Sequence, residues 1–188
     1  LNTLAGDIPG TVTASVSGTA AELEALTNLG TSDPITYTIT TNADASELKN
    51  IAGNTSLLNG SAAATFSSGK GVSDTLGNVM KNTTTLSDDL TTGRTVLSSD
   101  PDVTLSSSVA LSSQDDIKTL NSLFAHSDIG GVSGTITDTA GTYLLADDSA
   151  SATVYQLTPT AADSLTVNFG TVAAATLALN EIEDLAQM

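Results

Sequence analysis

The first clear pattern along the chain is the strict alternation of apolar and polar residues in residues 11–17. Val12, Ala14 and Val16 are separated by threonines and serines. A period of two places the apolar set on one face of a strand and the hydroxyl set on the other. Threonine and valine are β-branched and suit such a surface. The pattern therefore predicts a strand that is buried on one face only.

A short amphipathic helix is predicted directly after this strand. Thr19 precedes Glu22 by three positions, which is the capping-box spacing at a helix N-terminus. Leu23 and Leu26 then fall on one helical face. Because a helix of this length is marginal in water by itself, we expect both leucines to pack against neighbouring elements.

The same order of strand, cap and helix returns in residues 35–53. The first part alternates isoleucine and tyrosine with threonine, Asn42 or Asp44 is the predicted cap, and Leu48 and Ile51 define the apolar helix face. The two units together lead to one packing prediction. It buries Val16, Leu23, Leu26, Ile39, Leu48 and Ile51 and exposes Thr13, Glu24, Thr38 and Lys49.

Further elements follow at spacings of roughly 20–30 residues, which is the range of repeat arrays. Predicted strands cover residues 62–66, 95–97, 103–111, 134–138, 152–157 and 165–169, and residues 82–93 are predicted to hold a weak strand and a turn. Predicted helical segments cover residues 1–6, 72–80, 113–124, 139–146, 161–165 and 171–187. Ser113 is the predicted cap of the helix 113–124, with Asp115 and Asp116 in its first turn.

Strands that alternate with short helices favour a parallel sheet. Each unit has too thin an apolar face to be stable alone, so it must stack on the next. We therefore predict one α/β domain over residues 1–188, a repetitive strand–short-helix solenoid with a largely parallel sheet. The looser pattern of residues 54–112 keeps open the alternative of a β-sandwich with decorating helices. A start without methionine, in the repeat-like LNTLAGD, leads us to expect a fragment or processed piece of a longer chain.

The composition narrows the classes of partner. The chain has 21 acidic and five basic residues and a net charge of −16, which argues against binding to nucleic acid or to an anionic membrane surface. No continuous apolar stretch is long enough to span a bilayer, so we expect no membrane insertion. The absence of cysteine excludes disulfides and thiolate sites. With 31 threonines, 23 serines and few aromatics, the core must be built from aliphatic residues.

No arrangement of residues typical of an enzyme is found, and we expect no catalytic activity. Carboxylate pairs occur, but they are surrounded by serine, threonine and alanine, with few aromatic residues that could form a sugar platform. The single histidine, His126, is expected to be a surface or cap residue at a helix C-terminus.

Two kinds of site remain as candidates. Calcium is the one candidate cofactor, in a loop site near Asp100 and Asp102 or near Asp147 and Asp148, although the loop patterns of EF-hands and calcium-binding β-rolls are absent. Three N-x-S/T sequences also make asparagines candidate glycosylation sites. These are Asn54, Asn59 and Asn82.

The segments VSGTAAELEAL, TTNADASELKNI and GTITDTAGTYLLADD resemble degenerate repeats of very large, acidic, Thr/Ala/Asp-rich cell-surface proteins. Such proteins occur in marine cyanobacteria and other bacteria and are described as adhesin- or haemolysin-like, and similar repeats occur in virion fibres. The resemblance implies export to the cell surface and carries no catalytic residues. It leads us to expect an extracellular structural protein that forms homo-oligomers or polymers in a filament, fibre or surface layer. The alternatives are an adhesin module that binds a glycan or another cell, and a component of a virion fibre.

Overall fold

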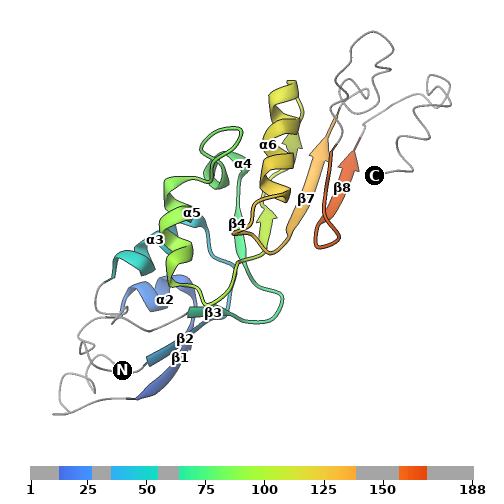
Figure 1. Cartoon of the computed structure of the whole chain (residues 1–188). Coiled ribbons are helices and arrows are strands. Elements are labelled where there is room, and N and C mark those ends of the chain that lie inside the picture. The colour runs from blue at the N-terminus through green and yellow to red at the C-terminus, as the bar shows by residue number, and fades with distance from the viewer. Residues whose placement is uncertain (1–12, 27–34, 55–63, 139–156, 169–188) are drawn as a thin grey trace, which may run out of the picture.

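The computed structural model describes residues 13–26, 35–54, 64–138 and 157–168, and the statements below refer to these residues. They form a mixed α/β structure in which parallel strands and short helices alternate. The array is elongated, with strand β1 (Ala14–Gly18) at one end and strand β8 (Ser164–Asn168) at the other (Figure 1). The prediction of an α/β class with a largely parallel sheet is confirmed at this level.

The other strands and the helices are short. The strands between the two ends are β2 (Ile35–Ile39), β3 (Ala64–Phe66), β4 (Val72–Asp74), β5 (Val103–Leu105), β6 (Val109–Ala110) and β7 (Val132–Thr137). The helices are α2 (Ala20–Glu24), α3 (Ala45–Gly53), α4 (Leu76–Val79), α5 (Asp88–Gly93) and α6 (Gln114–Phe124), with one 3-10 turn, η1 (Arg94–Val96).

The strands form two sheets whose strand pairs are all parallel. The first has the order β1-β2-β3, and the second has the order β4-β5-β7-β6 with β8 on β7. In the second sheet Val72 pairs with Val103 and Val103 with Val132, so that register partners lie about 30 residues apart in the chain. A β-sandwich is normally built of antiparallel strands, and this alternative does not match the pairing.

The two units that define the sequence pattern both fold as a strand followed by a capped helix, and β1 pairs in parallel with β2. In the first, the N–H of Thr19 donates to Oε2 of Glu22 (2.8 Å), and the N–H of Glu22 donates to Oγ1 of Thr19 (3.2 Å). In the second, Asp44 and Glu47 exchange the equivalent bonds at 2.8 and 3.0 Å. Asp44 is therefore the cap, and Asn42 is not.

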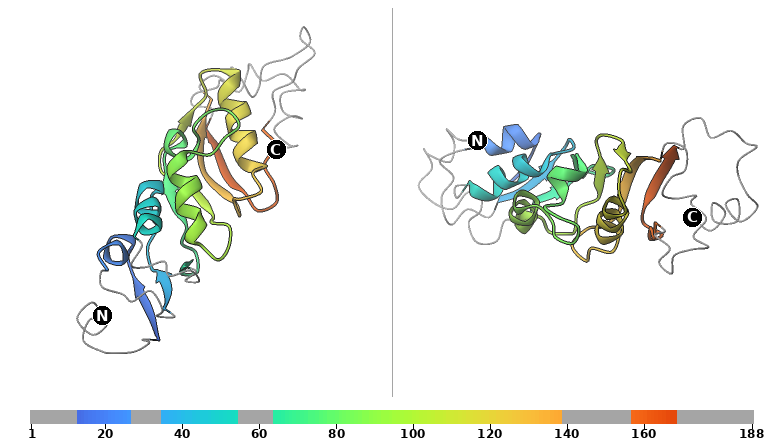
Figure 2. Two further views of the ribbon diagram at one scale, coloured as in Figure 1. Left: turned by 60° about the vertical axis from the view of Figure 1, so that its left-hand side comes forward. Right: turned by 90° about the horizontal axis from the view of Figure 1, so that it is seen from above.

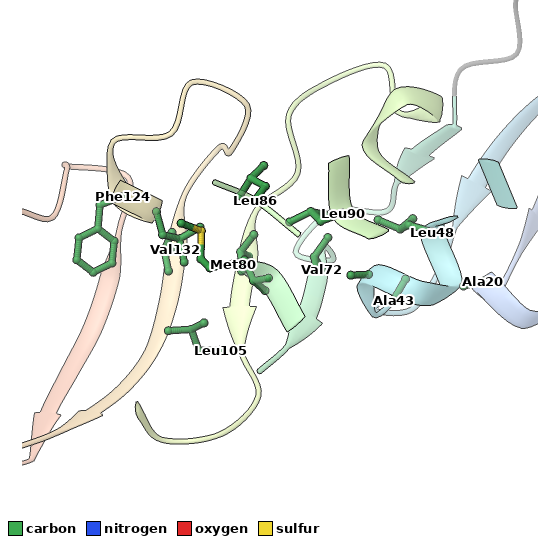
Figure 3. Packing of buried hydrophobic residues seen from close by; sticks show 14 of the residues in the cluster. Ala20, Ala43, Leu48, Val72, Met80, Leu86, Leu90, Leu105, Phe124 and Val132 are labelled. Atoms are coloured by element: carbon green, nitrogen blue, oxygen red, sulfur yellow. The ribbon is translucent and has the colours of Figure 1, made fainter. Parts of the chain in front are cut away.

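The core is a continuous cluster of mainly aliphatic side chains that runs along the array from α2 to β7 (Figure 3). The packing prediction is largely confirmed. Leu23, Ile39, Leu48 and Ile51 are buried, Val16, Leu26 and Thr38 are half-buried, and Thr13, Glu24 and Lys49 are exposed. Val16 and Leu26 lie at the first unit of the array, which explains why their cover is incomplete.

Residues 72–80 were expected to form one helix, and this prediction is wrong. Val72 begins β4, and its N–H donates to the carbonyl of Asp102 (2.8 Å), while Ala43 pairs with it on the other side. Pairing on both sides holds this segment extended. The helix α4 begins only after Thr75, whose Oγ1 accepts the N–H of Asn78 (3.3 Å).

Three further assignments are corrected by the structure. Residues 82–93 hold the helix α5, capped by Ser87, in place of a strand and a turn. Residues 95–97 lie largely in η1, and residues 161–165 form a turn that leads into β8, where a brief helix was predicted. The strand predicted over residues 103–111 is divided into β5 and β6.

The remaining predicted strands appear as β2, β3, β7 and β8 with slightly shifted bounds, and the helix 113–124 appears as α6. Ile117, Leu120, Leu123 and Phe124 of α6 are buried, as the helical spacing indicates. The predicted segments 1–6, 139–146 and 171–187, and residues 152–156 of the predicted strand 152–157, lie outside the described residues.

Gly93 allows α5 to pack closely against α3. A Cβ atom at this position would lie 2.5 Å from Cβ of Leu48 and 2.8 Å from the backbone nitrogen of Lys49. We expect Gly93→Ala to lower the free energy of unfolding by about 1–3 kcal/mol, because the helix backbone of α3 must move. Urea denaturation of the variant measures this. The matched control is Gly53→Ala, which has no atom within 4 Å of the added Cβ and should cost nothing.

The N-terminus of α6 makes a pH-dependent contribution to stability. Burial tends to raise the pKa of Asp116, but the N–H and O–H groups of Ser112 and Ser113 donate to its Oδ2, and together they bring the pKa below its ordinary value of 3.8. A lowered pKa in the folded state means that the contribution is present above the ordinary pKa and is lost as the pH falls through the folded-state value.

We therefore expect Asp116→Asn to destabilise the protein more at pH 7 than at pH 3, measured by urea denaturation at both values. Glu24→Gln, an exposed carboxylate near the end of α2, is the control and should show a smaller difference. An equal effect of Asp116→Asn at both pH values would contradict the prediction.

Candidate functional sites

Several charged side chains gather where the N-termini of α3, α4 and α5 lie near one another. They surround a solvent-accessible hollow of about 570 Å³. Its lining includes four carboxylates, one lysine and several small polar groups. The lining residues are Asp44, Ala45, Ser46, Asp74, Gly77, Asn78, Lys81, Ser87, Asp88 and Asp89.

Asp74 is the most buried carboxylate of this hollow, with 8% of its surface exposed. Its Oδ2 accepts the N–H of Ala45 at the start of α3 (3.1 Å). Its Oδ1 accepts the N–H of Thr75 (2.8 Å) and Nδ2 of Asn78 (2.7 Å) at the start of α4. One carboxylate therefore connects two helix N-termini, where a negative charge is favourable.

The other three carboxylates of the hollow also have structural partners. Asp44 caps α3, Asp88 pairs with Lys81 at 2.9 Å, and Asp89 pairs with Lys49 at 2.6 Å. Within the described ranges no group of three or more His, Cys, Asp or Glu side chains could hold a metal ion. The contacts of these carboxylates are those of helix capping and ion pairing, which hold α3, α4 and α5 together.

The structure describes two of the four calcium candidates, Asp100 and Asp102. Asp100 and Asp102 are both exposed and flank Pro101, and they line a hollow of about 340 Å³ that is also lined by Lys70. The backbone carbonyl of Asp102 accepts the N–H of Val72. The turn that contains Asp102 is therefore hydrogen-bonded to β4 of the second sheet. Asp147 and Asp148 lie outside the described residues.

Two of the three candidate glycosylation sites are described, and they differ. Nδ2 of Asn54 donates to the carbonyls of Glu24 and Leu26, both at 2.9 Å, and ties the end of α3 to the end of α2. Asn82 is exposed, and its Oδ1 accepts the N–H of Thr84 (2.9 Å) in a local turn. Attachment of a glycan to Asn54 would break the contact with α2. Asn59 lies outside the described residues.

His126 lies just after α6, at the helix C-terminus where it was expected. Its N–H donates to the carbonyl of Leu123 (3.1 Å), and its Nδ1 accepts the N–H of Asp128 (3.3 Å). Asp128 in turn pairs with Arg94 at 2.7 Å. This cluster joins the end of α6 to η1.

The two terminal strands differ from the inner strands in how far their apolar faces are covered. Ala14 and Val16 of β1 and Leu165 and Val167 of β8 are half-buried, whereas the inward side chains of β2 and β5 are buried. Among the described residues, β1 pairs only with β2, and β8 pairs only with β7. In the described part of the chain, each of these two strands therefore has a strand neighbour on one side.

Sequence reasoning missed the role of Asp74. A local signal for a helix start was present at the next residue. Thr75 is a preferred N-cap residue type, and it lies three positions before Asn78 and directly after Asp74. The bond to Ala45 had no local signal, since the two residues are brought together only by strand pairing.

Comparison with protein-family models, with curated proteins and with solved structures found no match. In the part of the chain that the structure describes, no helix is both long and apolar enough to cross a membrane.

Proposed function

We propose that this protein is an extracellular structural protein that assembles with copies of itself into a filament, fibre or surface layer. The observation that supports this proposal is that, among the described residues, the two parallel sheets form an elongated arrangement with a half-covered strand at each end. An exposed strand edge is a template for pairing with another chain, and an array with such an edge at each end could add further copies.

We further propose that the array is an open solenoid of strand–helix units. The support is the spacing of about 30 residues between register partners in the second sheet, together with the helices that follow β1, β2, β4 and β6. In a solenoid each unit contacts mainly its neighbours, and the terminal units stay uncovered unless they are capped. A virion fibre component would use the same geometry.

Extracellular location is part of the proposal. A net charge of −16 and the absence of cysteine fit a large surface protein that stays dispersed through self-repulsion. The resemblance of the sequence segments to repeats of acidic bacterial surface proteins supports the same location.

A second candidate function is an adhesin module that binds a glycan. It is favoured by the outward face of the second sheet, where the register partners Ser73, Thr104, Ser133 and Ser164 form a row of hydroxyl groups. Oγ1 of Thr104 and Oγ of Ser133 are hydrogen-bonded at 3.0 Å. A glycan array would test this function, and binding to a defined sugar would favour the adhesin.

Electron microscopy and sedimentation velocity of the purified protein test the main proposal. We expect ordered polymers whose mass rises with protein concentration. A stable monomer at all concentrations would contradict the assembly function. Immunogold labelling of source cells tests the location, and a label confined to the cell interior would contradict export.

A further inference from the structure

Within the residues that the structure describes, the two terminal strands show none of the sequence features that usually protect a strand edge. Natural proteins protect an edge with charged side chains, proline or a bulge. The sequences of β1 (ASVSG) and β8 (SLTVN) contain neither a charged residue nor proline. This is notable in a chain of net charge −16, because any acidic residue there would repel a second copy.

The backbone groups of the two strands point the right way for pairing with each other. The carbonyl of Asn168 accepts the N–H of Asp138 from the β7 side (3.0 Å). Since the backbone groups of successive strand residues point to alternate edges, those of Leu165 and Val167 point away from β7. In β1 the carbonyl of Gly18 accepts the N–H of Thr40 from the β2 side (2.9 Å), so the groups of Ser15 and Ser17 point away from β2.

The side chains of the two strands alternate in the same phase. A parallel pairing that places Leu165 beside Ala14 and Val167 beside Val16 puts all four half-buried side chains on the core face. It also places the exposed Thr166 beside the exposed Ser15. A shift by one residue would turn the apolar set of one strand to the solvent face, so the pattern selects this phase.

We propose that β8 of one copy pairs in parallel with β1 of the next copy, which continues the sheet and the core across the contact. This inference rests on the proposed self-assembly and names its interface. Because β1 and β8 lie at opposite ends of the array (Figure 2), the contact is head-to-tail, and such a contact produces an open filament unless the rotation closes a ring. Main-chain bonds between added strands supply the affinity, and alternate side chains supply the specificity.

Cross-linking tests the contact, because the chain has no cysteine of its own. Ser15→Cys and Thr166→Cys place thiols at exposed positions that face the same side of the proposed pair. A mixture of the two single variants, treated with a short bis-maleimide, should give a covalent dimer, and the double variant should give a ladder of covalent oligomers. The matched control mixes Thr166→Cys with Ser46→Cys, an exposed position on α3, and should give no dimer.

A second pair of variants blocks the contact directly. Val167→Pro removes an N–H that points to the outer edge of β8 and should abolish polymers, while Val167→Thr keeps the N–H and a β-branched side chain and should assemble. Far-UV circular dichroism should be alike for both. This interface would be wrong if polymers form but the thiols introduced at Ser15 and Thr166 do not cross-link. It would also be wrong if Ser46→Cys cross-links equally well. Either result would leave the proposed assembly function intact. A wild-type protein that never polymerises would overturn both.

Discussion

Replacing Asp74 with alanine is expected to lower the free energy of unfolding by about 2–4 kcal/mol. The substitution removes the acceptor of two backbone N–H groups, those of Ala45 and Thr75. A buried donor that loses its partner costs about 1–3 kcal/mol, and water from the adjoining hollow can replace only part of the loss. The carboxylate also faces the N-termini of α3 and α4, where its negative charge is stabilising. Urea denaturation followed by circular dichroism measures the change.

The matched control for Asp74 is Asp88→Ala in the same hollow. Asp88 is exposed and pairs with the exposed Lys81, and such surface pairs contribute about 0–1 kcal/mol. Asp74→Asn is an informative intermediate, because its amide oxygen can still accept one of the donors. If Asp74→Ala and Asp88→Ala destabilise the protein equally, the structural role assigned to Asp74 is wrong.

Replacing Leu23 with alanine is expected to cost about 2–5 kcal/mol, which is the usual range for a fully buried leucine. Leu23 is 1% exposed and belongs to the continuous aliphatic core. The helix α2 has only five residues, so its stability comes from packing against β1, β2 and α3. We expect loss of this side chain to release α2 and to uncover the first unit of the array.

Thermal and urea denaturation of Leu23→Ala measure this effect. Leu23→Met nearly conserves volume and should cost less than about 1.5 kcal/mol. Glu24→Ala lies on the exposed side of the same helix and serves as the surface control. A change within about 0.5 kcal/mol for Leu23→Ala, the range of ordinary surface substitutions, would refute the placement of Leu23 in the core.

Local patterns predicted most of the elements that depend on contacts within a few residues. The capping boxes at Thr19 and Asp44 depend on bonds between residues three positions apart, and both are present. The helix α6 has its cap, its acidic first turn and its apolar stripe within residues 113–124, and it was predicted correctly. The helix α5 was missed although Ser87, Asp88 and Asp89 repeat that signal.

Local patterns were wrong where pairing with a distant segment decided the conformation. Val72 has the apolar spacing of a helix with Leu76 and Val79, yet it lies between Ala43 and Val103 in a parallel ladder. These strand pairings join residues that are about 30 positions apart in the chain, and no local sequence pattern predicts them. The same reason explains why the acceptor role of Asp74 towards Ala45 could not be predicted.

The sequence by itself determined the class of this protein, because the period of two in its strands and the caps of its helices act over short distances. It also determined an aliphatic core, since almost no aromatic residues were available to build one. Only the tertiary structure decided which strands pair, where strand pairing interrupts a helical pattern, and that β1 and β8 lie at opposite ends of the described array. Those features depend on contacts between segments far apart in the chain, whose formation is governed by packing and not by local preference.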